Sequence, residues 1–120
     1  MGDALAGSDR PFVITSGTGM GTKVPGQPAT EDHFDPNHPN PRAGSEIAAE
    51  AVAGRGVRVT VVRLPQVHNT EKQGLVTPAI QIAREKGIAA YVGDGLNRWP
   101  AIHVLDAGMS IPANIPIQPK

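Results

Sequence analysis

Glycine and proline divide this chain into segments that can form regular structure and segments that cannot. The 120 residues include 14 glycines and 12 prolines, concentrated between residues 17 and 44 and after residue 109. Proline lacks a backbone N–H and interrupts both helices and inner strands. We therefore expect one domain over residues 1–107 with an irregular loop at 22–44, followed by an irregular or disordered tail at 108–120.

Short apolar runs between these segments are typical of strands. They predict strands at residues 11–16, 57–64, 88–92 and 101–104. The run at 57–64 is the strongest, and its apolar residues on both faces are typical of a parallel sheet that is covered on both sides. Residues 66–74 are polar and are expected to form a loop.

Two helices are predicted between the strands. Ser45 is a suitable N-cap for a helix over 46–53, and Thr77 followed by Pro78 is typical of the start of a helix that continues to residue 86. Each helix is followed by a glycine, at Gly54 and Gly87. Alternating strands and helices predict an α/β fold with a mostly parallel sheet flanked by helices.

Composition excludes several classes of function. The formal net charge is zero, so no electrostatic feature favours nucleic acid or an anionic membrane as a partner. Cysteine is absent, which excludes disulfides and cysteine-based metal or nucleophile chemistry. No apolar run approaches the roughly 20 residues of a membrane helix, and the N-terminus does not resemble a signal peptide. We expect a cytoplasmic protein.

The segment Gly17-Thr-Gly-Met-Gly21 follows a predicted strand and invites comparison with dinucleotide-binding loops. The glycine fingerprint requires a third glycine at the position of Thr22, and then a helix whose N-terminus receives the pyrophosphate. The next residues contain Pro25 and Pro28 and cannot form that helix. A flexible turn at the end of a strand is therefore the better interpretation.

Two further groups of polar residues have a functional and a structural interpretation. The loop contains five potential metal ligands: Glu31, Asp32, His33, Asp35 and His38. Their spacing matches no helical His-Glu signature, and metal sites built from a single loop are uncommon, so a solvated polar loop is favoured. Ser16 ends the first strand. A hydrolase using Ser16 with His68 or His103 would need one of these imidazoles as a positioned base. No Gly-x-Ser-x-Gly elbow surrounds Ser16, so a hydrogen-bonding serine at the sheet edge is favoured.

The order of these segments resembles that of atypical or extended short-chain dehydrogenase/reductases of the NAD-dependent epimerase/dehydratase type. Four segments carry the resemblance: Thr15-Ser-Gly-Thr18 with Gly21, Pro41-Arg-Ala-Gly-Ser-Glu-Ile-Ala-Ala-Glu50, Val59-Thr-Val-Val-Arg-Leu-Pro-Gln-Val-His68 and Gly93-Asp-Gly-Leu-Asn-Arg-Trp-Pro-Ala-Ile-His-Val-Leu-Asp106. The last segment is the most specific, and the likeness extends from about residue 2 to residue 107.

The resemblance implies a partial Rossmann-like fold, NAD or NADP as cofactor, and a small nucleotide-sugar-like substrate. By the same resemblance, Ser16 would hydrogen-bond the reacting carbonyl or hydroxyl. Pro65, Gln66 and Val67 would line the nicotinamide side through their backbone. Arg98 and His103 would face the substrate.

The chain departs from the family at the catalytic Tyr-x-x-x-Lys pair, whose positions fall on Arg42 and Glu46. Arginine stays charged and cannot replace the tyrosine as acid/base, and a glutamate has the wrong sign to favour a phenolate. The first half of the family's fold, with its glycine fingerprint, is also missing.

The sequence therefore predicts a fragment or truncated member that is inactive alone. The alternative is a non-catalytic dinucleotide-sensing or interaction module. An unpaired sheet edge would allow a homodimer.

Overall fold

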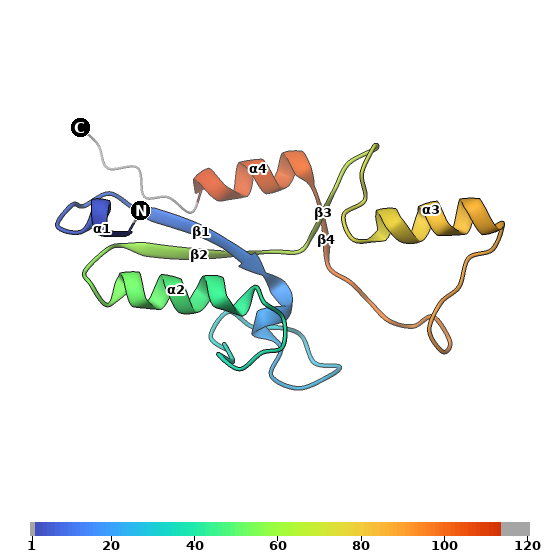
Figure 1. Ribbon diagram of the computed structural model, residues 1–120, viewed down its shortest axis with the longest axis horizontal. Coiled ribbons are helices and arrows are strands. Elements are labelled where there is room, and N and C mark those ends of the chain that lie inside the picture. The colour runs from blue at the N-terminus through green and yellow to red at the C-terminus, as the bar shows by residue number, and fades with distance from the viewer. Residues whose placement is uncertain (1, 114–120) are drawn as a thin grey trace.

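The computed structural model describes residues 2–113 and shows a mixed α/β arrangement (Figure 1). The described residues form four short strands and four α-helices, with one 3-10 helix after the first strand and no helix between the second and third strands. Their bounds are α1 Gly2–Leu5, β1 Phe12–Gly17, η1 Thr18–Gly21, α2 Ala43–Ala53, β2 Val59–Leu64, β3 Gln66–His68, α3 Val76–Lys86, β4 Ala101–His103 and α4 Val104–Ala113.

The central unit is β1–α2–β2. The two strands are parallel, and their register runs from Phe12 opposite Val59 to Gly17 opposite Leu64. Helix α2 packs against both strands, and in Figure 1 it lies on the opposite side of the strand pair from α4. Small side chains allow the close approach of α2, since Ala43 and Ala49 are both buried. The described buried core also includes Met20, Val57 and Ala107.

A second parallel pair joins β3 to β4, with His68 opposite His103. The described strands thus form two separate two-stranded sheets. The structure confirms a mixed α/β arrangement with parallel pairing. Within residues 2–113 it does not show the continuous Rossmann-like sheet that the resemblance implied.

Three predicted segments differ from the structure. Residues 88–92 form no strand, and Tyr91 and Val92 are 74% and 85% exposed, because an apolar run forms a strand only where another strand pairs with it. Residues 66–68 form β3 instead of loop, because Gln66 N donates to Pro100 O and this tertiary pairing overrides the polar composition. Residues 108–113, predicted as tail, belong to α4, whereas the tail predicted at 114–120 lies outside the described residues.

The predicted helix starts are displaced. Helix α2 begins at Ala43, and Ser45 is not its N-cap. Asn40 instead starts the turn: its Oδ1 accepts from Arg42 N at 3.0 Å, and its carbonyl accepts from Ala43 N. Helix α3 begins at Val76, before Thr77. Gly87 ends α3 with a φ of 67°, as predicted.

The loop prediction for residues 22–44 is confirmed over 22–42, where the structure contains no helix or strand. The expectation that both faces of the 57–64 strand are buried is wrong. The strand begins at Val59, and Val61 is 37% exposed. Only one described helix, α2, packs on this strand pair closely enough to cover it.

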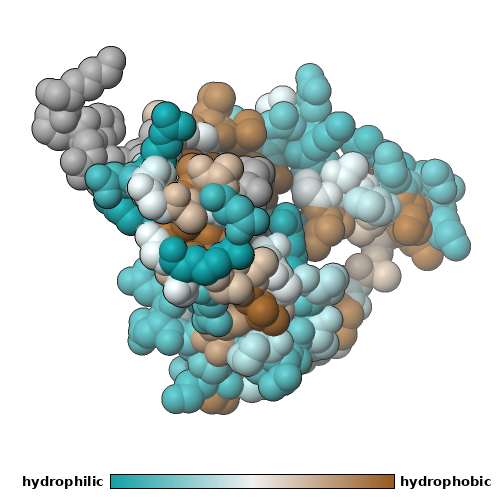
Figure 2. Space-filling view, turned by 60° about the vertical axis from the view of Figure 1, so that its left-hand side comes forward, coloured by the Kyte–Doolittle hydropathy of each residue, from teal (hydrophilic) through white to brown (hydrophobic). Residues whose placement is uncertain are grey.

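The chain exposes an unusually large surface. Its accessible area is 9257 Å² for 12.5 kDa, whereas a compact monomer of that mass exposes about 6,200 Å². No described residue of α3 is buried. Figure 2 shows apolar side chains reaching the surface at several places, including the region of α3 on the right. Exposed large apolar side chains such as Leu75, Val92 and Leu96 are typical of proteins that contact another chain or further parts of a larger fold.

Candidate functional site

The candidate site lies at the carboxyl edge of the β1–β2 pair. Because the strands are parallel, Gly17 and Leu64 end at the same edge, and Ser16 lies opposite Arg63 in the register. In α/β proteins this edge is where ligands usually bind. Helix α2 crosses one face of the pair and places Glu46 beside the two strand ends.

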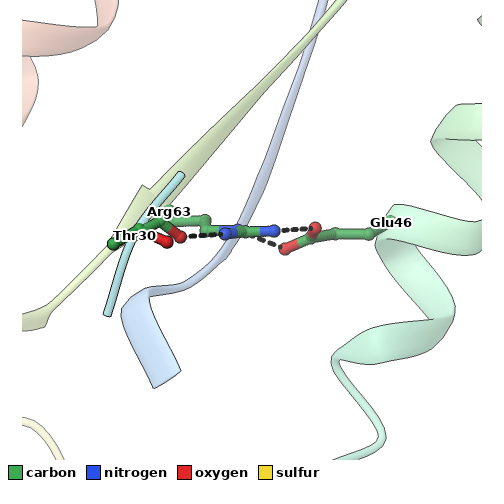
Figure 3. Close-up of polar contacts among 3 residues, drawn as sticks. All are labelled: Thr30, Glu46 and Arg63. Carbon is green, nitrogen blue, oxygen red and sulfur yellow. Dashed lines mark hydrogen bonds and ion pairs between the residues drawn. The ribbon is translucent and has the colours of Figure 1, made fainter. Parts of the chain in front are cut away.

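Arg63 forms the central interaction of the site (Figure 3). Its Nε donates to Glu46 Oε1 at 3.0 Å, and its Nη2 donates to Glu46 Oε2 at 2.8 Å. Its Nη1 donates to the carbonyl oxygen of Thr30 at 3.0 Å. Only 14% of the Arg63 side chain and 6% of the Glu46 side chain are exposed. One guanidinium therefore connects β2, α2 and the irregular 22–42 loop.

The pair fixes both charges. The hydrogen bonds from Arg63 hold the pKa of Glu46 below its ordinary value; burial opposes this shift, and the nearby Ser16 hydroxyl and the Arg63 charge add to it. The same hydrogen bonds raise the pKa of Arg63. A carboxylate with a lowered pKa is a weak base, and the arginine does not release its proton. Neither group can act as an acid/base near neutral pH.

Ser16 is buried beside this pair. It is 4% exposed, and although its hydroxyl helps to lower the pKa of Glu46, no described atom reaches Ser16 Oγ with hydrogen-bond geometry. The two imidazoles considered as partners contact each other, since the rings of His68 and His103 lie 5.7 Å apart in a T-shaped arrangement on β3 and β4. The described structure thus supplies no base for a nucleophilic Ser16.

The other residues implied by the resemblance lie in different places. Arg42 precedes α2 and is exposed. Gln66 and Val67 lie on β3, directly after Pro65 and the end of β2, and Gln66 Oε1 accepts from Leu75 N. Arg98 lies in the exposed segment before β4. The structure therefore brings Ser16 and Glu46 together but shows no contact that joins Arg98 to them.

The candidate metal ligands of the loop have local roles. Asp35 Oδ1 accepts from Asn37 N, and His38 Nδ1 accepts from Asn40 N. Over residues 2–113, no three histidine, aspartate or glutamate side chains gather into a metal-binding group. None of the helices in this range is long and apolar enough to cross a bilayer.

The glycine-rich segment does not fit a pyrophosphate. It forms the four-residue 3-10 helix η1, in which Gly21 is buried. The carbonyl oxygen of Thr30 packs directly against the Cα of Gly21, and Thr30 N donates to Gly21 O at 3.0 Å. The fingerprint requires an α-helix whose N-terminus receives the pyrophosphate, whereas here a four-residue 3-10 helix is followed by the irregular 22–42 loop. The close approach of the loop to η1 accounts for a glycine at position 21.

Sequence reasoning gave Arg63 and Thr30 no role. A signal was available for Arg63, because a charged residue within an otherwise apolar strand is rarely buried without a partner. Its partner could not be found by spacing, since Glu46 lies 17 positions away on a different element. Thr30 acts through its backbone carbonyl, which leaves no trace in the side-chain pattern.

The Glu46–Arg63 pair should make the stability of the chain depend on pH. Because the pKa of Glu46 is lowered in the folded state, its contribution is complete above the ordinary value of 4.5 and is lost as the pH falls through the folded pKa. Urea unfolding of the wild type and Glu46→Gln should converge as the solution is acidified. In contrast, the difference between the wild type and Glu50→Gln, a change at an exposed position of α2, should stay small at every pH. A gap for Glu46→Gln that persists at low pH would contradict this assignment.

Comparison with curated proteins finds two similar yeast proteins, both described as uncharacterized. One, from Schizosaccharomyces pombe, is 38% identical over 108 residues, which are 89% of this chain and 36% of that protein. The other, from Saccharomyces cerevisiae, is 37% identical over 106 residues, 87% of this chain and 35% of that protein. This chain thus spans about a third of the length of these relatives. No family model matches it, and no solved structure matches it.

Proposed function

We propose that this chain is part of an NAD(P)-dependent epimerase/reductase-type fold and that alone it neither binds the dinucleotide nor transfers hydride. The observation that carries the proposal is the buried Glu46–Arg63 pair. Following the resemblance, Glu46 stands where the family has its catalytic lysine. Here the position faces Ser16 but holds a carboxylate that Arg63 keeps ionised.

The β1–α2–β2 unit supports this proposal. A serine at the carboxyl end of a strand, beside a helix that crosses the strand pair, is the local arrangement that the resemblance implies. The position expected for the tyrosine holds Arg42, which is exposed and permanently charged. Two further observations support the proposal: Arg42 cannot donate the proton that the family's tyrosine transfers, and η1 is too short to be the helix that receives a pyrophosphate.

The remaining assignments of this proposal rest on the resemblance. Backbone groups of Pro65, Gln66 and Val67 would line the nicotinamide side, and Arg98 and His103 would face a small nucleotide-sugar-like substrate. In a longer protein of the size of the yeast relatives, other segments would hold the cofactor. We also propose that such a longer protein has NAD(P)-dependent epimerase or reductase activity.

Calorimetric titration of the chain with NAD(H) and NADP(H) tests the proposal. We expect no heat of binding and no change in nicotinamide absorbance when candidate sugar nucleotides are added. The full-length yeast relatives serve as comparison proteins under the same conditions. Hydride transfer by this chain alone would overturn the proposal.

A non-catalytic dinucleotide-sensing or interaction module is the second candidate. The exposed apolar side chains favour it, since Leu75, Val92 and Leu96 are all more than 70% exposed and are available for contact with another chain. The same titration distinguishes the two candidates. Micromolar dinucleotide binding without hydride transfer would support a sensor and contradict the first proposal.

A further inference from the structure

Strand β2 has a free edge. Phe12 N donates to Arg58 O at 2.8 Å, which fixes the phase of the parallel ladder with β1. In such a ladder alternate residues point their N–H and C=O groups toward the partner strand. The backbone groups of Val59, Val61 and Arg63 therefore point away from β1. No other described strand pairs with this edge.

The free edge forms one wall of a groove of about 920 Å³. Helix α2 forms the second wall, and the 29–34 part of the loop forms the third. Apolar side chains from all three walls line it, among them Phe34, Ala49 and Val61. A hydrogen-bonding strand edge beside apolar side chains is the arrangement that binds an extended peptide by β-strand addition.

The charge of the groove favours a basic peptide over an acidic one. Glu31, Asp32 and Glu50 line the groove and are exposed. The single basic group in its lining, Arg63, is neutralised by Glu46. The groove therefore carries an excess of negative charge, which attracts basic side chains and repels acidic ones.

We propose that this groove binds an extended, basic segment of a partner polypeptide, which adds a strand to the free edge of β2. Alternate apolar side chains of the segment pack toward α2, and its basic side chains lie near Glu31, Asp32 and Glu50. A second copy of this chain is disfavoured as occupant, because antiparallel pairing of two β2 edges would bring the same acidic groups together. The inference goes beyond the proposed function and involves no dinucleotide.

A synthetic peptide of sequence Lys-Val-Thr-Val-Lys-Val-Thr, blocked at both ends and carrying a fluorophore, provides the probe. Fluorescence anisotropy should show binding that weakens as salt is added. The same peptide with glutamate in place of lysine should bind with an affinity lower by a factor of about ten or more, and a factor of ten corresponds to about 1.4 kcal/mol. A peptide with proline at its central valine should not bind, because it cannot complete the ladder.

Two measurements on the protein complete the test. The double variant Glu31→Gln/Asp32→Asn should lose several-fold in affinity for the lysine peptide, whereas Glu85→Gln on α3 should not. Hydrogen exchange should show new protection at the amides of Val61 and Arg63 when the peptide is bound. Equal binding of the lysine and glutamate peptides, or no new protection at these amides, would overturn the proposal. So would a dimer of the chain alone that protects them, since a second copy would then be the occupant.

Discussion

Replacing Glu46 with leucine is expected to lower the free energy of unfolding by about 3 kcal/mol, because loss of one partner leaves a buried charge without compensation. Arg63 would keep only its hydrogen bond to Thr30 O. The link between α2 and β2 would be lost at a point where both side chains are largely buried. Urea unfolding followed by circular dichroism measures the change.

Two variants separate the charge effect from the effect of the leucine. Glu50→Leu makes the same change on the same helix at an exposed position, and its effect should stay within about 0.5 kcal/mol. The double variant Glu46→Leu/Arg63→Met replaces the whole pair by apolar side chains and should recover most of the loss. If the double variant is as unstable as Glu46→Leu, the unpaired charge is not the cause.

The elements predicted well from the sequence are those whose signals are local. Strands β1 and β2 and helix α2 follow one another within residues 12–64, and each has a strong apolar or helix-forming pattern. Gly87 also ends α3 as expected, because a left-handed residue there depends only on the local backbone.

The elements that were missed depend on contacts between distant segments. Strand β3 is polar, and it exists because Gln66 pairs with Ala101 on β4. The apolar run at 88–92 has no described partner strand and stays irregular. Composition within a short window does not contain this information, since pairing decides which runs become strands.

The candidate site shows the same division. The resemblance directed attention to position 46, and the residue type there excluded a lysine-like role. The role of the Glu46 carboxylate depends instead on Arg63, which lies on β2, 17 positions later in the sequence. Spacing along one helix cannot indicate that contact, and the backbone carbonyl of Thr30 has no sequence signal at all.

Replacing Gly21 with alanine is expected to destabilise the chain by about 1–3 kcal/mol, the usual cost of forcing an extra methyl group into a packed site. The methyl group would overlap the carbonyl oxygen of Thr30 and lie 2.9 Å from Arg63 Nη1. The loop would have to move away, which weakens the bond from Thr30 N to Gly21 O and the bond from Arg63 to Thr30 O. Urea unfolding measures the loss of stability. Hydrogen exchange at the Thr30 amide shows whether the loop keeps its hydrogen bond to Gly21 O.

Gly19→Ala is the matched control for this change. Gly19 belongs to the same 3-10 helix, and a methyl group built there meets no atom within 4 Å. Stability and Thr30 exchange should stay close to those of the wild type. The comparison also tests the role of the glycine-rich segment: a packing role predicts that only Gly21→Ala is costly, whereas a flexible turn open to solvent predicts similar small effects at both positions. Equal effects of the two substitutions would therefore contradict the close packing of the loop on η1.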